Sequence, residues 1–335
     1  MIIQINSQEY KIIKELGQGA FGKVYQVINN NCNKYYAIKK ILLKNLNENQ
    51  FENIQNEAKI LSNIESEYIV KYYDSFKDKD SFNILMEYCE NDLKNFINEY
   101  KNKNELLDEN IIYNIIKQIC LGIKEIHKKN LIHRDLKPEN IFINKDYKIK
   151  IGDFGISKEL DFNNKYAYTS IGTNIYMAPE MIKGEKYNEK VDIWALGCII
   201  YELFTLNACF ESKCLFGLVN KILNENHGTI DINKYNNKWQ NLIDLLLKKD
   251  YKERPNIDKV YEFFNKEKKK EIIQIKDNGY KGMVKLSQQE VYHLREHGSI
   301  IIICHVRKYF YIIILMNIVL VLGCTDIGKT SLIET

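Results

Sequence analysis

Residues 133–155 read HRDLKPENIFINKDYKIKIGDFG, and this stretch decides the fold. Two short apolar runs of strand type, at 141–143 and 149–151, lie between polar loops, which predicts a small hairpin. The loops beside the hairpin carry three polar groups: Asp135, Asn140 and Asp153. Phosphoryl transfer needs such a set, because one carboxylate must orient a hydroxyl while neighbouring oxygens bind a magnesium ion. The stretch therefore indicates a phosphotransferase site.

Composition narrows the class of protein. The 335 residues are 45% apolar and 27% charged, which suits one large or two modest soluble domains. A net charge of only +4 does not favour a nucleic-acid partner, since that would need a clustered basic face. The eight cysteines form no CxxC pair, so we expect free thiols in a reducing, cytoplasmic setting. The N-terminal segment lacks the basic and small-residue pattern of a signal peptide.

A glycine-rich segment joins two predicted strands near the N-terminus, and a third strand follows the Asn-rich turn at 29–33. Glycines let backbone approach phosphate closely because they carry no Cβ. The same glycine spacing occurs in dinucleotide-binding folds, but there a helix follows, whereas here a strand does. We therefore predict a nucleotide-binding loop made by these residues: Leu16, Gly17, Gln18, Gly19, Ala20, Phe21, Gly22, Lys23 and Val24.

The third strand contains the sequence AIKK. Because strand side chains alternate, Ala37 and Lys39 share one face and Lys40 lies on the other. We expect Ala37 to contact adenine and Lys39 to reach the α- and β-phosphates. Helical spacing of apolar residues over 49–64 predicts a helix that carries Glu57. Its carboxylate is expected to pair with Lys39, with an ordinary surface ion pair as the alternative.

Two further runs of strand type, at 69–76 and 82–87, lead into the sequence MEYCEND. An apolar run turns polar there, as expected of a hinge between two lobes. We predict that Met86 lies at the back of the adenine pocket. The backbone of Glu87 and Cys89 is expected to hydrogen-bond the adenine edge.

The chain that follows is expected to be mainly helical, with helices at 93–100 and 108–128. The second has a wide apolar stripe and should be buried. His127 in its last turn is expected to be a cap or a surface residue rather than a catalytic one.

Three charged residues stand in apolar or proline-marked surroundings. Asp192 opens a near-continuous apolar helix, so its carboxylate should cap or grip backbone, most simply that of the loop around Asp135. Glu180 and Arg254 are far apart in sequence, but pairing them would allow both charges to be buried.

The motifs together resemble those of the eukaryotic protein kinases over residues 10–264. The serine/threonine branch is indicated by Lys137 in HRDLKPEN and Thr173 in GTNIYMAPE. The NIMA-related kinases are resembled by three stretches: KIGDFGISKEL, DIWALGCIIYELFTLNACFES and LVNKI. The resemblance implies an α+β, bilobal protein-kinase fold, with a small β-rich N-lobe containing one key helix and a large, mainly helical C-lobe.

The resemblance also implies the chemistry: a serine/threonine protein kinase that uses ATP and Mg²⁺ and acts on protein hydroxyls. Asp135 would orient the substrate hydroxyl and accept its proton, and Lys137 would neutralise the transferring group. Asn140 and Asp153 would hold Mg²⁺. A pseudokinase scaffold is the alternative, but it would require the loss of Lys39, Asp135 or Asp153.

Residues 156–176 form a long polar loop between DFG and APE. We expect Arg134 to bind a phosphate placed on Thr169 or Ser170 by an upstream kinase or by the protein itself. Thr173 is expected beside the catalytic Asp and Lys, and merely solvated hydroxyls are the alternative. The resemblance suggests a cytoplasmic, cytoskeletal or nuclear location.

Two features depart from the family pattern. Asn174 replaces the proline usual after GT, and the hinge is one residue shorter than the common form with two glycines. The shorter hinge bears on whether Asp92 contacts the ribose. The coiled coil that often follows such domains is absent.

Beyond residue 264 the sequence changes character. Residues 265–299 form a basic linker with a predicted polar helix at 283–299, and 300–335 is an apolar segment. Its run at 310–322 predicts a core helix or two strands and is short for a membrane span.

The sequence GCTDIGKTS at 323–331 matches a phosphate-binding loop and predicts a strand, a loop and the start of a helix. Lys329 and Thr330 would be its phosphate and metal residues. Because the chain stops soon afterwards, we expect no working NTPase here. A truncated fusion, an erroneous gene boundary or a chance match would each account for the motif.

Overall fold

The computed structural model describes residues 2–5, 8–19, 22–45, 47–153 and 175–264, and the backbone of four short strands between residues 302 and 331. The chain divides into two compact units, Met1–Lys269 and Lys270–Thr335. None of the helices in the described part has the length and apolar character needed to cross a membrane.

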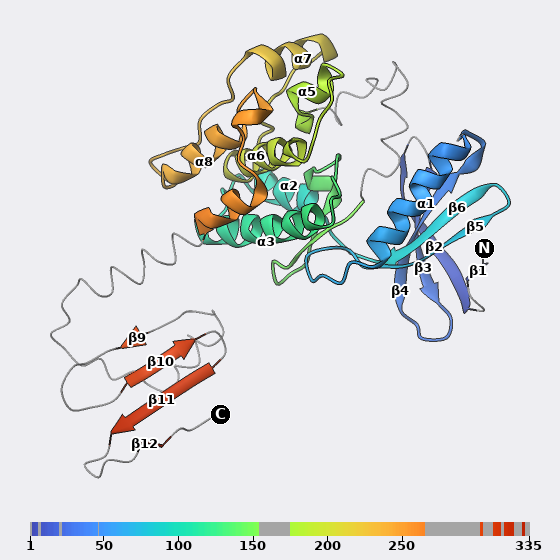
Figure 1. Cartoon of the computed structure of the whole chain (residues 1–335), viewed down its shortest axis with the longest axis horizontal. Coiled ribbons are helices and arrows are strands. Elements are labelled where there is room, and N and C mark those ends of the chain that lie inside the picture. Colours follow the sequence, from blue (N-terminus) through green and yellow to red (C-terminus); the bar gives the residue numbers. More distant parts are fainter. Residues whose placement is uncertain are drawn as a thin grey trace. The chain divides into compact units, whose positions relative to one another are not determined.

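The first unit begins with a six-stranded antiparallel sheet in the order β1-β2-β3-β4-β6-β5 (Figure 1). Its strands are β1 (Ile2–Ile5), β2 (Gln8–Gly19), β3 (Gly22–Asn29), β4 (Tyr35–Leu42), β5 (Tyr72–Asp78) and β6 (Ser81–Glu87). Helix α1 (Glu48–Ser62) contacts β5. Its apolar positions Ile54, Ala58 and Leu61 are buried, as their helical spacing predicts. The three predicted strands, the helix and the two later strands are thus confirmed.

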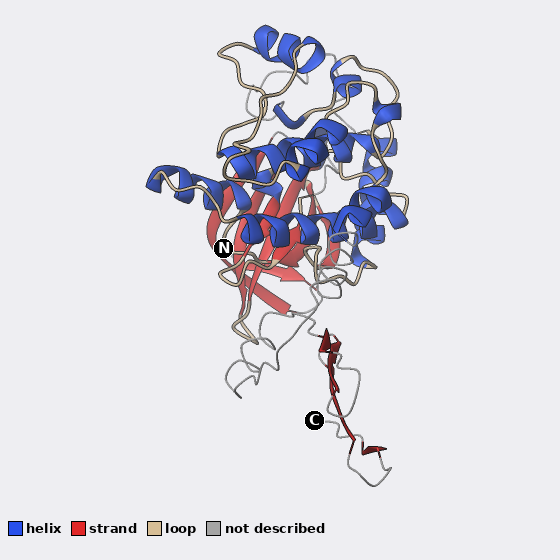
Figure 2. Cartoon of the chain, turned by 90° about the vertical axis from the view of Figure 1, so that its left-hand side faces the viewer, coloured by secondary structure: helices blue, strands red, loops and turns tan. Residues whose placement is uncertain are grey.

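The remainder of this unit is mainly helical: in Figure 1 its helices lie together beside the sheet, and in Figure 2 they lie in front of it. This segregation is the α+β arrangement, so the predicted bilobal fold is confirmed. The helices are α2 (Leu93–Lys103), α3 (Glu109–Lys128), α5 (Pro179–Ile182), α6 (Lys190–Thr205), α7 (Leu215–Asn224) and α8 (Lys238–Leu246), with a last helical stretch at 257–264.

Helix α3 shows why these segments are helical. Asp108 caps its first turn by accepting the backbone N–H of Asn110 at 2.8 Å. The six isoleucines of the predicted stripe are fully buried: Ile112, Ile115, Ile116, Ile119, Ile123 and Ile126. Helix α6 is buried on nearly every side, which its continuous apolar sequence requires.

The hairpin of β7 (Ile141–Ile143) and β8 (Ile149–Ile151) forms as predicted, with Ile141 opposite Ile151. Strand β8 also bonds the segment that leads into β5: the N–H of Val70 donates to Ile151 O at 2.8 Å, and the N–H of Ile151 donates to Tyr68 O at 2.8 Å. These bonds connect the hairpin to the segment between α1 and β5.

The second unit contains a separate four-stranded sheet in the order β12-β11-β10-β9. The strands are β9 (Ile302–Ile303), β10 (Tyr311–Leu315), β11 (Ile318–Cys324) and β12 (Thr330–Ser331). Of the two alternatives for 310–322, two strands are correct. The predicted polar helix at 283–299 lies outside the described residues.

The prediction that a helix starts after the phosphate-loop motif is wrong. Thr330 and Ser331 form a strand antiparallel to β11, with Gly323 opposite Ser331. Pairing with β11 satisfies backbone groups that a helix would otherwise satisfy internally. A phosphate-binding loop needs the N–H groups of a helix N-terminus at this point, and the described residues provide none there. Lys329 lies outside the described residues.

Candidate active site

The glycine-rich loop is formed by β2 and β3, which pair down to Gly19 opposite Gly22. A Cβ on Gly22 would collide with the backbone carbonyl of Lys40 in β4, so glycine is required there for sheet packing as well. A Cβ on Gly17 would meet no described atom within 4 Å. Ala20 and Phe21 lie outside the described residues.

Strand β4 places the predicted adenine and phosphate residues on one face. Ala37 is opposite Met86 of β6, and both side chains are buried. Two residues along the strand, the Lys39 ammonium binds Asp153 Oδ1. Lys39 and Asp153 are 114 residues apart in sequence, so the fold joins the sheet to the loop after β8 at this point.

Glu57 lies on α1, but its side chain is outside the described part of the structure. The predicted pair between Glu57 and Lys39 therefore stays a prediction. Among the described side chains, Asp153 binds Lys39.

The loop before β7 brings its predicted residues together. Lys137 Nζ lies 3.0 Å from Asp135 Oδ2. Asn140 Nδ2 donates to Asp135 O at 2.8 Å, to Asp135 Oδ2 at 3.1 Å and to Asp153 O at 3.4 Å. The carboxylate of Asp135, the ammonium of Lys137 and the amide of Asn140 thus lie together, and the amide also reaches the backbone of Asp153.

The amide of Asn140 also bears on the predicted metal. Because its Nδ2 makes all three of these donations, Oδ1 is the atom left to bind a cation. Oxygen from Asn140 and from the Asp153 carboxylate is the donor set that Mg²⁺ prefers. The described residues contain no group of three or more His, Cys, Asp or Glu that could hold a metal by itself. These two oxygens therefore fit a metal that also binds substrate phosphates.

Asp192, at the start of α6, binds the backbone of the loop that contains Asp135. Its carboxylate accepts the backbone N–H of His133 at 2.9 Å and that of Arg134 at 3.0 Å. The prediction that Asp192 grips this backbone is confirmed. Burial alone would raise the pKa of Asp192, but the bond to His127 and the bonded backbone groups outweigh it and lower the pKa.

The expectation that His127 is a cap or a surface residue is wrong. Its Nε2 lies 2.8 Å from Asp192 Oδ2, and its side chain is only 9% exposed. It is thus neither a surface residue nor a simple cap, but a partner of the carboxylate that holds the loop.

His133 links the two polar loops. It is fully buried, and its Nε2 hydrogen-bonds Gly152 O at 3.0 Å. Burial lowers the pKa of His133, which keeps the ring neutral.

Two residues near His133 adopt positive φ: Arg134 at 67° and Asp153 at 50°. Such backbone costs about 1–3 kcal/mol and persists only where surrounding bonds impose it.

In the hinge at residues 86–92, one backbone group predicted to bind adenine already has a partner within the protein. The N–H of Glu87 donates to Lys71 O at 2.8 Å, so only the carbonyl of Glu87 can serve adenine. The Glu87 carboxylate pairs with Lys150 of β8 at 3.0 Å. Burial, and then the Glu87 charge, raise the pKa of Cys89 to about 12, so its thiol is unreactive.

Asp92 caps α2, accepting the N–H of Asn95 at 2.8 Å on one oxygen and Asn95 Nδ2 at 2.8 Å on the other. Each carboxylate oxygen thus makes one bond within the helix cap, and contact of Asp92 with the ribose stays a prediction.

The predicted regulatory residues Thr169, Ser170 and Thr173 lie in 154–174, outside the described residues. After residue 174, two buried polar contacts hold the chain, one through Glu180 and one through Tyr176. Glu180 and Arg254 form the predicted buried pair, with bonds of 2.8 and 2.6 Å between guanidinium and carboxylate. Tyr176 donates its hydroxyl to Glu202 Oε2 at 2.5 Å.

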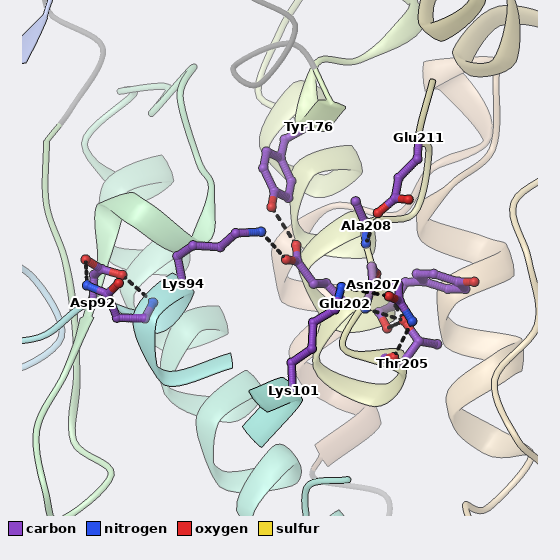
Figure 3. A network of polar contacts seen from close by, with 11 residues as sticks. Asp92, Lys94, Lys101, Tyr176, Glu202, Thr205, Asn207, Ala208 and Glu211 are labelled. Carbon is purple, nitrogen blue, oxygen red and sulfur yellow. Dashed lines mark hydrogen bonds and ion pairs between the residues drawn. The ribbon is translucent and has the colours of Figure 1, made fainter. Parts of the chain in front are cut away.

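Glu202 and its partners were not predicted from the sequence. The acid is buried in α6 and receives Tyr176 from one side and Lys94 Nζ, at 2.6 Å, from the other (Figure 3). An acid inside the apolar run IIYELF is the kind of signal that identified Asp192, and it could have identified Glu202 as well.

The chain is also similar in sequence to known proteins. The protein kinase domain model matches residues 10–264. The chain is 35% identical over 283 residues to "Probable serine/threonine-protein kinase nek2" of Dictyostelium discoideum, covering 82% of this chain and 67% of the relative. It is 35% identical over 256 residues to mouse "Serine/threonine-protein kinase Nek1" and 36% over 254 residues to human "Serine/threonine-protein kinase Nek5". The matches cover 76% and 75% of this chain but only 21% and 36% of those relatives' own length.

Proposed function

The chain belongs to the protein kinases, in their NIMA-related branch, and from this membership we propose that it transfers the γ-phosphoryl group of ATP to serine and threonine hydroxyls of proteins. The convergence of Asp135, Lys137, Asn140, Asp153 and Lys39 supports this proposal most directly. These residues come from a sheet strand and two loops, and they are of the types that phosphoryl transfer needs beside its metal.

Each residue has a distinct part in the transfer. Asp135 orients the attacking hydroxyl and accepts its proton as the new bond to phosphorus forms. Lys137, 3.0 Å from this carboxylate, balances the negative charge that gathers on the transferring group. Lys39 holds the α- and β-phosphates in place. Asn140 Oδ1 and the Asp153 carboxylate would hold Mg²⁺, which when bound neutralises charge on the phosphates.

The contact between Lys39 and Asp153 has a consequence for nucleotide binding. The ammonium that should bind phosphate is already paired with the carboxylate that should bind Mg²⁺. When ATP and the metal enter together, the phosphates replace Asp153 as the partner of Lys39, and the metal replaces Lys39 as the partner of Asp153. This exchange lets the site admit the nucleotide with its metal more readily than either alone.

Two other functions have less support. A pseudokinase scaffold would need Lys39, Asp135 or Asp153 to be replaced, and all three are present. A P-loop NTPase would need a helix where β12 stands. We further propose that residues 10–264 are the catalytic domain; the compact unit Met1–Lys269 supports this division.

Regulation is proposed on the loop outside the described residues. Phosphorylation of Thr169 or Ser170, by the protein itself or by another kinase, would place a dianion near Arg134 and order the loop. Thr173 would approach Asp135 and Lys137. The cysteine pattern supports a cytoplasmic location, and the composition supports neither a nucleic-acid nor a membrane partner.

The test is transfer of labelled phosphate from ATP to an array of serine and threonine peptides. Asp135→Asn should lower the rate by about 100-fold or more while ATP still binds, because it removes only the proton acceptor. The matched control is Asp146→Asn, in the exposed turn of the same hairpin, which should leave the rate unchanged. A rate unaffected by Asp135→Asn would refute the mechanism. Nucleotide binding without any transfer by the unaltered chain would favour the scaffold.

A further inference from the structure

A charged side chain connects the hairpin of β7 and β8 to the hinge. Lys150 is the middle residue of β8, and its Nζ lies 3.0 Å from Oε2 of Glu87, the last residue of β6. The same oxygen accepts the backbone N–H of Lys71 at 3.2 Å. The side chains of Lys150 and Glu87 are 30% and 27% exposed, so the ion pair is partly shielded from solvent. Such a pair is screened less by salt than one on the open surface.

Residues 68–71 lie between β8 and the hinge. Two backbone hydrogen bonds of 2.8 Å join this segment to Ile151 on one side. On the other side, the N–H of Glu87 donates to Lys71 O at 2.8 Å. The backbone therefore connects β8 to the hinge only through a third segment at this point, whereas the side chain of Lys150 connects them directly.

The hairpin also bonds the far end of the hinge. The N–H of Ile143 in β7 donates to Asn91 O at 3.0 Å. Its neighbour Phe142 forms an isolated antiparallel bridge with Asp92. The hinge is thus held against one hairpin at both ends, by backbone at Asn91 and Asp92 and by the ion pair at Glu87.

Strand β8 ends beside the residues proposed to bind Mg²⁺. The N–H of Gly152 donates to Asn140 O at 2.9 Å, and Asp153 follows directly. Asp153 is the third residue after Lys150, so their backbones are at most about 11 Å apart. A short segment of chain therefore has a bond to the hinge at its start and the metal-binding carboxylate at its end.

ATP must fit both ends of this segment at once. Its adenine is expected at the hinge, and its phosphates are expected at the metal that Asp153 would hold. A ligand that makes two sets of contacts binds well only when the protein holds both sets at the matching separation, since small misplacements weaken one set.

We propose that Lys150 is a positioning residue for the nucleotide, which sets the hinge relative to Asp153 by binding Glu87. This inference rests on the proposed function, because it takes adenine to bind at the hinge and Mg²⁺ at Asp153. Lys150 acts through Glu87 and through β8 rather than by touching the reacting atoms. A ligand that occupies only the hinge should therefore be nearly insensitive to Lys150, whereas a ligand that spans both places should depend on it.

The experiment compares two ligands by calorimetry on the full chain: adenosine, and adenylyl imidodiphosphate with Mg²⁺. In Lys150→Met the second ligand should bind about three- to tenfold more weakly, and adenosine should change by less than about twofold. In the transfer assay the KM for ATP should rise by a similar factor while kcat is kept. Equal losses for the two ligands, or no loss for either, would overturn the proposal.

A matched lysine and a conservative change make the assignment specific. Lys148→Met, at an exposed lysine of the same hairpin, should leave both affinities unchanged. Lys150→Arg keeps a cation that can reach Glu87 and should restore most of the affinity lost in Lys150→Met. Circular dichroism checks the folding of each variant. A merely structural role would lower the melting temperature without separating the two ligands.

A double-mutant cycle tests whether Lys150 acts through Glu87. Glu87→Gln keeps an acceptor for the N–H of Lys71 but removes the charge, so it should weaken the Mg²⁺-bound ligand as much as Lys150→Met does. The double variant should be no worse than either single variant, because both changes remove the same contact. Losses that add up would overturn the proposed route through Glu87.

Failure of the proposed function would give a different result. Because affinities are measured without transfer, an unaltered chain that bound both ligands but phosphorylated no peptide would refute the transferase. The ratio of the two affinities in Lys150→Met would still decide the positioning role. An unaltered chain that bound neither ligand would overturn both.

Discussion

Asp192 accepts the backbone N–H of His133 at 2.9 Å, although 59 residues separate them in the sequence. His133 in turn hydrogen-bonds Gly152 O, the carbonyl just before Asp153. One buried carboxylate at the start of α6 thus binds the backbone of the loop proposed to be catalytic, and a single imidazole links that loop to the one proposed to bind Mg²⁺. Side chains that perform chemistry need such support, because small misplacements cost large factors in rate.

Replacing Asp192 by Asn tests this support. The amide keeps the shape of the carboxylate but turns one acceptor into a donor that faces a backbone N–H. We expect a loss of about 2–4 kcal/mol in unfolding free energy, since a charged acceptor is lost in a buried place. The rate of phosphoryl transfer should fall by about 100-fold through displacement of the loop. Urea denaturation and the transfer assay measure the two effects.

Asp258→Asn is the matched control for that change. Asp258 is 62% exposed on its side chain and pairs with Lys124 at the surface, so its loss should cost less than about 1 kcal/mol. Similar losses of stability in the two variants would mean that the buried bonds to His133 and Arg134 contribute little.

Lys39 and Lys40 provide a second matched pair. They are adjacent in β4 and point to opposite faces, and Lys39 alone reaches Asp153 in the described structure. Lys39→Met should lower the transfer rate by about 100–1,000-fold, because the phosphates lose a preorganised cation. Lys40→Met should leave it near that of the unaltered chain. Comparable losses in both variants would show that general charge, rather than position, explains the effect.

Gly152 is the residue that lets Asp153 approach the sheet. A Cβ there would lie 2.6 Å from Val70 Cγ2 and 2.9 Å from Phe142 Cε2. Gly152→Ala should therefore cost about 1–3 kcal/mol of stability and lower the transfer rate at least tenfold by shifting Asp153. Adding Val70→Ala makes room on one side and should restore part of both losses. A double variant no better than the single one would exclude Val70 as the obstacle.

The spacing of apolar residues predicted much of this fold, because it shows which face of each helix or strand is buried. The hairpin at 141–151 follows from two short apolar runs, and helix α3 from its stripe of isoleucines. Asp192, Glu180 and Arg254 were identified because an isolated charge in apolar surroundings must find a partner. In each case, the need to bury an apolar face or to pair a charge can be read from a few neighbouring residues.

The missed features depend on partners that the local pattern cannot show. His127 is bound by an acid 65 residues away, and nothing near it in the sequence indicates this. Glu202 could have been noticed as a buried acid, but its choice of Lys94 and Tyr176 is made by the fold. The motif ending in Thr330 predicted a helix, yet β11 offered an antiparallel edge and the residues became a strand.

His133 makes the stability of the protein depend on pH. Burial lowers its pKa in the folded state below the ordinary value of 6.5, so the unfolded chain takes up this proton first. The contribution is present above about pH 6.5 and is lost as the pH falls toward the lower, folded pKa. We expect the melting temperature to drop between about pH 7.5 and 5.5. The drop should persist in His227→Asn and His127→Asn, and a flat profile in the unaltered chain would contradict it.

The pair of Glu180 and Arg254 is expected to be intolerant of conservative change. Both side chains are almost fully buried, and the guanidinium also donates to the carbonyls of Lys248 and Lys190 at 2.8 and 2.9 Å. A lysine at 254 keeps the charge but cannot reproduce this planar set of donors. Arg254→Lys should therefore cost about 3–5 kcal/mol in urea denaturation, because it leaves Glu180 buried with an incomplete partner. The double change Glu180→Gln with Arg254→Met removes both charges and should cost less than either single change. If the double variant instead lost the sum of the two single losses, the residues would be acting independently, and the pairing would not explain why the chain after residue 174 is held against α6.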